Sequence, residues 1–248
     1  MKDSQEELDD PTALEGGTPR TLAEKIYRQL RTDIVWGRLA PGAQLRSDDL
    51  RRTYSIGISP LREALSRLAS ERLVTASEQR GFRVAPLTVE DVRDTMETRL
   101  VLECEALARA IAAGDIAWES RVVASYHLLS RVGVPSGPGP EAELWARYHR
   151  DFHMALIAAC GSRWQLALAG LLFDQAERHR AVVIMQHATP MGALRDPASE
   201  HQRILEAVLA RDPAAAAAAL DEHYRTTAGR LIELIENHAL AGILAGID

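Results

Sequence analysis

The sequence predicts a mainly α-helical protein in two parts: three short helices followed by a β-hairpin, and then a bundle made of helices alone. The first observation behind this prediction is that apolar residues recur with a period near 3.6 along most of the chain. The second is that the period falls to about 2 between residues 73 and 86. With 248 residues, 46% of them hydrophobic, the chain is long enough for two separate cores.

The net charge of -6 conceals an asymmetry along the chain. Residues 20–86 hold 13 Lys/Arg and 7 Asp/Glu, which gives +6, whereas residues 87–248 hold 15 and 22, which gives -7. A basic module ahead of an acidic one is typical of a head that contacts phosphates on a body with another task. An unevenly charged, solvated surface is the alternative. Residues 1–19 are polar and acidic, and we expect a disordered tail there.

Neither a membrane segment nor a cysteine framework is predicted. No apolar run approaches the roughly 18 residues that span a bilayer, so we expect a soluble, cytoplasmic protein without a membrane partner. Cys104 and Cys160 stand among Ala and Leu in helical stretches, without the spacing of a disulfide framework or zinc finger. Both are expected to be core residues.

The first helix is expected to begin at Thr21, whose N-cap side chain and Glu24 form a capping box, and to end at Gly37. Its predicted inner face consists of Leu22, Ile26, Leu30 and Ile34. A short second helix follows, with Ser47 as its N-cap.

A third helix and a hairpin complete the first part. Ser59 is the predicted N-cap of this helix and Pro60 its first residue, a position where the missing N–H costs nothing. The inward-facing residues are expected to be Leu61, Ala64, Leu65 and Leu68. "LVTAS" and "FRVAP" then read as two strands around "EQRG", with Gly81 near the tip. Three short helices and a basic hairpin describe a winged helix-turn-helix, which we assign to residues 20–86.

Residues 87–248 are predicted to be all-helical. A second capping box, Thr88 with Asp91, starts the first of these helices. Its apolar stripe is Leu100, Cys104, Leu107, Ala108 and Ile111, and it ends at Gly114. Further helices are expected at about 116–131, 141–160, 162–187, 197–211 and 213–240, with a loop rich in proline and glycine before the second of these.

The first part has the features of a DNA-binding head. A helix in the major groove needs short or polar residues at its N-terminus, and cations beside it for the phosphates. Arg62 is placed on the exposed first turn of the third helix, and Arg80 at the wing tip suits a narrow minor groove. Solubilising charges on a small helical domain are the alternative. The candidate DNA-binding residues are Arg46, Arg51, Arg52, Ser59, Pro60, Arg62, Arg80 and Gly81.

The segments "LAEKIYRQLRTDIVWGRLAPGAQL", "SPLREALSRLASERLV" and "QRGFRV" closely resemble the N-terminal domain of GntR-family bacterial transcription regulators. Arg62 matches the family's Arg in "REAL", and Pro60, Glu63 and Gly81 match as well. Ile58 stands where the family usually has an Arg that reads guanine. The resemblance therefore implies an operator that differs from the usual one.

A histidine pair marks the second part. His149 and His153 in "RYHRDFHMAL" are four residues apart, so on a helix they share a face and can reach one ion. Two ligands bind weakly, and a site needs a third or fourth. From the residues alone, two ordinary histidines on a polar face remain the alternative. The remaining histidines are His127, His179, His187, His201, His223 and His238.

The second part also resembles the all-helical FCD domain of the FadR subgroup, in which a helical bundle encloses a metal. The resemblance implies four ligands, namely His149, His153, His201 and His223, the first standing where Asp is common in the subgroup. Four neutral imidazoles favour Zn or Ni and an anionic ligand to complete the shell. Arg99 matches an Arg that faces the cavity, which implies a small organic acid as effector. Within the subgroup, the spacing is most similar to that of carbon-starvation regulators, whose effectors are short dicarboxylates.

Catalysis has no support in the sequence. An HExxH site would need Glu at position 150, where Arg150 stands, and neither a P-loop nor a nucleophile elbow is present. A structural adaptor would leave the basic head unexplained. We therefore predict a transcription regulator, a homodimeric repressor that binds a double-stranded DNA operator and responds to an effector at the metal cavity. The alternative is a metal-dependent hydrolase with an accessory nucleic-acid-binding head.

Overall fold

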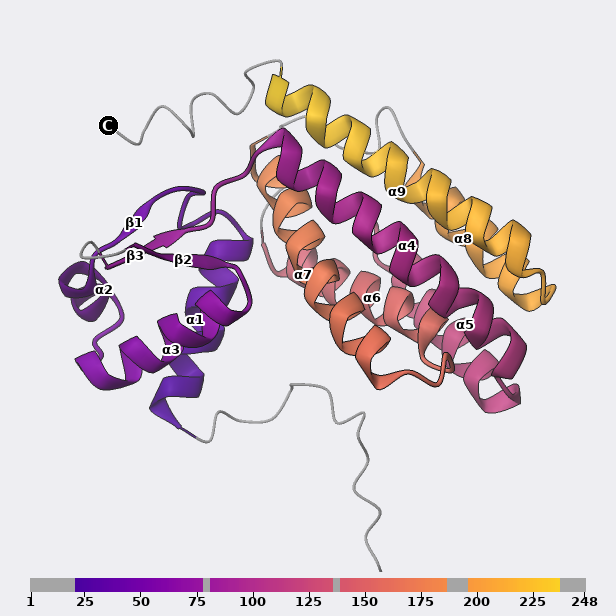
Figure 1. The fold of residues 1–248 in the computed structure, drawn as a ribbon, viewed down its shortest axis with the longest axis horizontal. Coiled ribbons are helices and arrows are strands. Elements are labelled where there is room, and N and C mark those ends of the chain that lie inside the picture. Colours follow the sequence, from indigo (N-terminus) through magenta and orange to yellow (C-terminus); the bar gives the residue numbers. More distant parts are fainter. Residues whose placement is uncertain (1–20, 78–80, 136–138, 187–195, 237–248) are drawn as a thin grey trace, which may run out of the picture.

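The computed structural model describes residues 21–77, 81–135, 139–186 and 196–236, and in these ranges the fold is mainly helical, as the periodicity predicts. A small head holds three helices and a three-stranded sheet, and a larger body holds helices alone (Figure 1). The head elements are α1 (Leu22–Val35), β1 (Gln44–Leu45), α2 (Ser47–Thr53), α3 (Ile58–Ser70), β2 (Val74–Ser77) and β3 (Gly81–Val84). The body elements are α4 (Val89–Ala113), α5 (Ile116–Arg131), α6 (Pro140–Ile157), α7 (Arg163–Gln186), α8 (Pro197–Leu209) and α9 (Pro213–Glu236).

The head forms largely as its apolar pattern predicts. Thr21 accepts a hydrogen bond from the backbone N–H of Glu24, at 3.1 Å, and so caps α1. The predicted inner face of α3 is buried throughout. Leu22, in contrast, is 57% exposed, and the expectation that it faces inward is wrong. Ala23 is buried in its place, because the inner stripe of α1 starts one residue later, while Ile26, Leu30 and Ile34 are buried as predicted.

The second helix begins one residue earlier than expected, and the third begins two residues earlier. Ser47 is the first residue of α2 rather than its N-cap, a place taken by Arg46. α3 starts at Ile58 with Gly57 as N-cap, so Ser59 and Pro60 lie within its first turn. Pro60 is tolerated there because the first-turn N–H groups have no partner in the helix.

The hairpin predicted from the period of 2 is present, and a short third strand joins it. β2 and β3 pair antiparallel, with Val74 opposite Val84 and Ser77 opposite Gly81. β1 pairs with the other edge of β3, with Leu45 opposite Phe82, which gives the order β1-β3-β2. Two residues are too few to show a period, so the sequence pattern could not reveal this strand.

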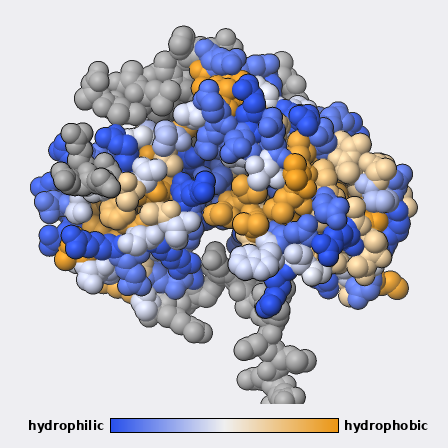
Figure 2. Space-filling model, in the orientation of Figure 1, coloured by the Kyte–Doolittle hydropathy of each residue, from blue (hydrophilic) through white to orange (hydrophobic). Residues whose placement is uncertain are grey.

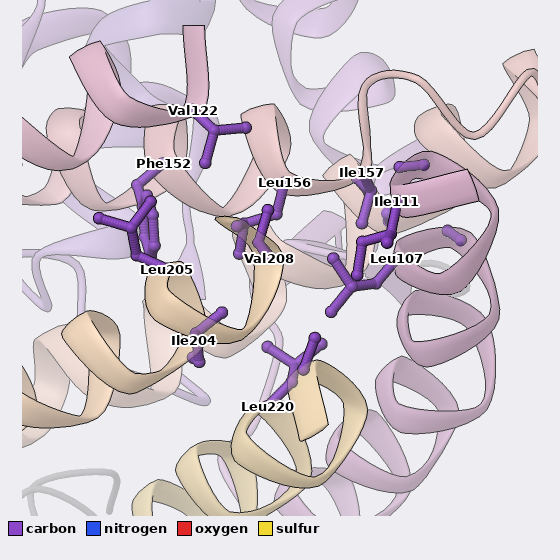
Figure 3. Close-up of a cluster of buried hydrophobic side chains, with 14 of the residues drawn as sticks. Leu107, Ile111, Val122, Phe152, Leu156, Ile157, Ile204, Leu205, Val208 and Leu220 are labelled. Atoms are coloured by element: carbon purple, nitrogen blue, oxygen red, sulfur yellow. The ribbon is translucent and has the colours of Figure 1, made fainter. Parts of the chain in front are cut away.

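The body is a bundle in which the long helix α4 lies alongside α9 (Figure 1). The side chain of Thr88 caps α4 by accepting a hydrogen bond from the N–H of Asp91 at 3.1 Å. The carboxylate of Asp212 accepts from the N–H groups of Ala214 and Ala215 at the start of α9. One continuous core lies between the helices (Figure 3). Its central side chains are Leu107, Ile111, Val122, Phe152, Leu156, Ile157, Ile204, Leu205, Val208 and Leu220.

Most of the visible surface is hydrophilic, with hydrophobic side chains in separate patches (Figure 2). None of the helices in the described ranges has both the length and the apolar character needed to cross a membrane. Cys160 is buried as expected, whereas Cys104 is only partly buried, and both are free thiols.

Candidate metal centre and nucleic-acid interface

Four histidine side chains from three helices meet inside the body. His149 and His153 lie one turn apart on α6, while His201 and His223 come from α8 and α9. One ring nitrogen of each lies within 4.8 Å of those of the other three. All four side chains are buried, with at most 8% exposed. Positions far apart in the sequence therefore converge on one point.

Aromatic packing holds these rings in place. His149 stacks on Trp145, with ring centroids 4.4 Å apart. Phe152, which is fully buried, lies 5.6 Å from the rings of both His153 and His201. Because α6 has 3.6 residues per turn, His149, Phe152 and His153 lie on one face of the helix. The core and the histidine cluster are thus built by the same helix.

Hydrogen bonds orient two of the rings. His223 donates from Nδ1 to Glu200 Oε2 at 2.7 Å. The hydroxyl group of Tyr224 donates a hydrogen bond to Glu103 Oε2 at 2.6 Å. Its oxygen therefore accepts from Nδ1 of His153 at 3.2 Å. Each ring therefore carries its proton on Nδ1 and a lone pair on Nε2. This is the arrangement in which an imidazole serves as a metal ligand.

The positions of three ring nitrogens are consistent with a cation in the cluster. His153 Nε2 and His201 Nε2 face each other at 3.4 Å. His149 Nδ1 is buried and has no hydrogen-bond partner in the described structure, with Glu177 Oε2 at 3.8 Å. An unpaired buried nitrogen costs on the order of 1–3 kcal/mol. Coordination removes that cost, and four imidazoles suit Zn or Ni better than Mg or Ca.

The electrostatics keep the rings neutral. Burial lowers the pKa of His149 and His153 well below the ordinary value of 6.5, and the neighbouring imidazoles lower the pKa of both further. A metal ligand must be a neutral imidazole, so binding of a metal near neutral pH needs no loss of a proton from these two rings.

A cavity of about 60 Å³ adjoins the histidines, larger than the ~10–15 Å³ that one water needs. Arg99 lines it and is only 7% exposed. Its guanidinium is already engaged, since Nε donates to Glu103 Oε1 at 2.7 Å and Nη2 donates to the hydroxyl of Tyr224 at 2.6 Å. The predicted effector residue thus lies at the cavity, in an ion pair with the chain's own carboxylate.

A second buried ion pair at the cavity lies on α7. Arg180 pairs with Glu177 through both guanidinium nitrogens that face it, and its charge lies 4.2 Å from the centre of the Trp145 ring. Both residues line the cavity. Two charges can be buried together in this way because each compensates the other.

Sequence reasoning missed these carboxylates and their partners. The missed residues that line the cavity are Glu177, Arg180 and Tyr224, and the missed partners behind its lining are Glu103 at Arg99 and Glu200 at His223. A signal was present for two pairs: Glu103 follows Arg99 by four residues and Arg180 follows Glu177 by three, the spacings that place side chains together on a helix. Tyr224 contacts residues more than 70 positions away, so no local pattern marks it.

On the head, the candidate DNA-binding residues gather around α2 and α3. Arg62 and Ser59 are exposed on the first turns of α3, and Ile58 beside them is 42% exposed. Gly81 begins β3 with φ of +84°, a conformation that glycine adopts without strain. Pro60 is half-buried in the first turn of α3. Arg80 lies outside the described residues.

Two of the predicted phosphate contacts are held by acids of their own helix. Arg52 pairs with Asp49 at 2.5 Å, and Arg51 lies 3.6 Å from Asp48. All four side chains are largely exposed, so these pairs are worth little and exchange readily for phosphates. Arg46, at the start of α2, is also exposed.

Helix α7 touches both the cavity and the head through three consecutive residues. Glu177 lines the cavity, whereas Arg178 donates to the carbonyls of Ala85 and Pro86 at 3.0 and 3.2 Å, in the segment that joins head to body. The carboxylate of Asp91, near the start of α4, accepts from Arg178 at 3.0 Å and from His179 at 2.8 Å.

The head also contacts α7 directly. Arg31 of α1 pairs with Asp174 at 2.6 Å, and Gln175 donates to the backbone carbonyl of Glu71 at 2.6 Å. Val35 and Trp36, at the end of α1, pack in one apolar cluster with Ala142 and Ala181 of the body. Any shift of α7 therefore reaches the head.

Comparison with known families gives two matches that together span both parts. A family model described as "FCD domain" matches residues 94–226, and one described as "Bacterial regulatory proteins, gntR family" matches residues 22–84. The chain is 42% identical over 195 residues to the HTH-type transcriptional regulator BphR of Paraburkholderia xenovorans (strain LB400), with 78% of each chain covered. It is 38% identical over 200 residues to the HTH-type transcriptional repressor GlaR of Escherichia coli (strain K12), covering 81% of this chain and 91% of that one.

Solved structures show the same fold. McbR/YncC of E. coli superposes with a TM-score of 0.70 at 20% identity, over 87% of this chain and 99% of that chain. A transcriptional regulator from Rhodococcus sp. RHA1 gives a TM-score of 0.65 at 23% identity, over 85% and 97%. At these identities the likeness concerns the fold alone.

Proposed function

The chain belongs to the GntR family of bacterial regulators and carries an FCD domain, and from this premise we propose that it is a repressor whose operator affinity depends on an organic acid bound beside a metal. The family is one of transcription regulators and not of enzymes, which argues against the alternative of a metal-dependent hydrolase. We assign the DNA-binding head to residues 20–86, the effector- and metal-binding body to residues 87–248, and residues 1–19 to a tail.

The observation that carries the proposal is the convergence of His149, His153, His201 and His223 within 4.8 Å. Buried imidazoles are rarely collected in this way without a ligand, because each leaves a nitrogen to be satisfied. The four rings would hold a divalent metal, and we propose Zn or Ni because all donors are nitrogens. When bound, the metal supplies positive charge that attracts an acidic effector.

The residues around the histidines have supporting tasks. Glu200 holds the ring of His223, and Tyr224 holds the ring of His153. Arg99 forms part of the effector cavity, and its hydrogen bond to Tyr224 joins the cavity wall to a metal ligand. A molecule in the cavity would therefore alter contacts on α4, α6 and α9 together.

The head would grip DNA through α3 in the major groove. Arg62 and Ser59 are placed to reach base edges, while Arg46, Arg51 and Arg52 are placed for phosphates. Gly81 and the adjoining Arg80, which lies outside the described residues, would form the wing contact. Two such heads in a homodimer would meet a two-fold operator about one helical turn apart.

Regulation requires the cavity and the head to share an element that has two positions. We propose helix α7 for this part, because Glu177 lines the cavity while Arg178 binds the carbonyls of the segment between head and body and His179 binds Asp91 of α4. An effector changes DNA affinity only by the difference between its affinities for the two positions, typically about 1–3 kcal/mol. We expect the effector to relieve repression.

Metal analysis of the purified chain tests the site. His153→Ala and His223→Ala are expected to lose most of the bound metal, because each removes one of four ligands. His127→Ala, which changes an exposed histidine on α5, is the control and should retain it. Equal metal content in all three variants would contradict the site.

DNA binding is tested by an electrophoretic shift on the chain's own upstream region. Arg62→Ala is expected to weaken the shift strongly, and Arg163→Ala, on an exposed position of α7, is the control. If the Arg62→Ala chain binds as the unmodified chain does, α3 is not the reading helix.

A further inference from the structure

We propose that the cavity selects an organic acid with one carboxylate and an apolar body, and that it discriminates against dicarboxylates. This inference rests on the metal site proposed above, and it differs from the short dicarboxylate that the family resemblance implies. It is carried by the charges already present around the cavity and by the nature of its walls.

The first cavity arginine has no charge to spare. Arg99 meets Glu103 along two donors, with Nε at 2.7 Å and Nη2 at 3.4 Å from its carboxylate oxygens. Both side chains are nearly fully buried, at 7% and 3% exposure. Tyr224 bonds to both partners and closes the group. An acid that approached Arg99 would therefore meet a guanidinium whose charge the buried carboxylate of Glu103 already offsets.

The second cavity arginine is neutralised in the same way. Arg180 and Glu177 are 5% and 8% exposed, and the Nε of Arg180 donates to Glu177 Oε2 at 3.0 Å. The two charges lie on one helix at a spacing of three, at which side chains of a helix reach each other. Among the described residues that line the cavity, these are the only two arginines, and no lysine lines it.

A charge count around the cavity follows. A divalent metal held by four neutral imidazoles brings +2, the two Arg–Glu pairs bring zero, and Glu200 at His223 brings -1. The buried excess is therefore +1. One carboxylate cancels it, whereas a second carboxylate would be buried as an unpaired charge beside Glu103 and Glu177. Unpaired buried charges are strongly disfavoured.

The remaining walls suit a hydrocarbon or aromatic group. Phe173 and Trp145 present rings, and Met96 presents a polarizable side chain that adapts to irregular shapes. The further apolar lining residues are Val92, Val134, Ala176, Pro197, Ala228 and Leu231. The polar groups on these walls are the hydroxyls of Thr95 and Thr227 and the ring of His179, which is bonded to Asp91, so the walls favour burial of apolar surface and offer no cation to a second carboxylate.

Calorimetric titration of the full chain, loaded with Zn and checked for metal content, tests the proposal. The probes are matched acids of equal carbon number, hexanoate against adipate, with 4-methylbenzoate against terephthalate as an aromatic pair. We expect each monocarboxylate to bind at least about tenfold more tightly than its partner, a difference of ~1.4 kcal/mol. Equal or tighter binding of the dicarboxylates would overturn the inference.

Two variants test the cause of the selectivity. Glu103→Gln and Glu177→Gln each remove one neutralising carboxylate while keeping the side-chain shape, so each frees one guanidinium for a second acid group. Adipate should then bind at least about tenfold more tightly than it binds the unmodified chain. Glu105→Gln, on an exposed position of α4, is the matched control. If the variants fold, as circular dichroism will show, and adipate binding does not improve in either, the neutralisation argument is wrong.

The outcomes separate this inference from the function it rests on. A chain that binds Zn but neither member of an acid pair keeps the metal site and overturns the carboxylate preference. A chain that binds no metal overturns both. A chain that binds Zn and prefers the dicarboxylates keeps the proposed function and overturns the inference alone.

Discussion

The Nδ1 of His223 lies 2.7 Å from Oε2 of Glu200, so the carboxylate on α8 fixes the ring of a histidine on α9. Glu200 directly precedes His201, whose own ring nitrogen belongs to the same cluster. Two neighbouring residues of α8 therefore serve one site in different ways, His201 by providing a nitrogen and Glu200 by orienting another. The contact also fixes the register of α8 against α9 at the point where both helices reach the cavity.

Glu200→Gln is expected to lower the affinity for Zn by about 10–100-fold, because the ring of His223 loses the negative partner that orients it and raises its basicity. Competition against a chromophoric chelator measures this affinity. Glu206→Gln, on an exposed position of the same helix, is the control and should leave it unchanged. A Zn affinity of the Glu200→Gln chain equal to that of the control would show that the contact has no part in metal binding.

Much of the fold was predictable because its signals are local. The capping side chains of Thr21 and Thr88 lie three residues from the N–H groups they accept from, and the bounds of α5 follow from Asp115 and the apolar period. The start of α3 was placed two residues late, since Pro60 suggested a first position and Ser59 a cap. In the structure Gly57 takes that place, without a side-chain cap, and the helix begins at Ile58.

The site was predictable in its histidines and not in its charges. His149 and His153 form a local pattern, and the family resemblance supplied His201 and His223. The partners of Arg99 were missed because a guanidinium facing a cavity does not reveal whether a carboxylate of the chain already binds it. Tyr224, adjacent to His223 in sequence, binds Arg99 on α4 across 125 positions, and only the packing of α4 against α9 brings them together.

Alanine at two glycines is expected to have opposite effects on the free energy of unfolding. At Gly114, which ends α4, an added Cβ would overlap the ring of Trp118 and lie 2.7 Å from the carbonyl of Ala110. Gly114→Ala should therefore destabilise by about 1–3 kcal/mol. At Gly229 in α9 the Cβ would meet no atom within 4 Å, so Gly229→Ala should stabilise by about 0.5–1 kcal/mol. Urea unfolding measures both. Stabilisation by Gly114→Ala would contradict the packing at Gly114, and destabilisation by Gly229→Ala would contradict the open space at Gly229.

The contact between α7 and the start of α4 should weaken in acid. Burial lowers the pKa of His179 below 6.5 despite its bond to Asp91, so the folded state keeps this ring neutral while the unfolded state takes up a proton. The contribution is therefore present above pH 6.5 and is lost as the pH falls below it. The pKa of Asp91 is lowered by its bond to His179 and by Arg178, so its contribution is lost only as the pH falls below the ordinary value of 3.8.

Urea unfolding at pH 7.5 and 5.5 tests this prediction. The unmodified chain should lose more stability between the two pH values than His179→Gln, by on the order of 1 kcal/mol. His127→Gln, at an exposed position, is the control and should behave as the unmodified chain does. If His179→Gln shows the same pH dependence as the unmodified chain, the ring of His179 is not held neutral.

Two arginines of the head should affect DNA binding in different ways, because they are placed for different parts of the duplex. Arg46 precedes α2 and is exposed, in a position for a phosphate, so Arg46→Ala should reduce the slope of log K against log salt concentration by about 1. It should weaken binding to operator and to unrelated DNA alike.

Arg62, on an early turn of α3, is placed for a base edge, so Arg62→Ala should cost ~1–3 kcal/mol on the operator and much less on unrelated DNA. Fluorescence anisotropy at several salt concentrations, with the upstream region and a scrambled duplex of equal length, measures both quantities. Equal losses on the two duplexes for Arg62→Ala would make this side chain a phosphate contact and would move base reading to other residues of α3.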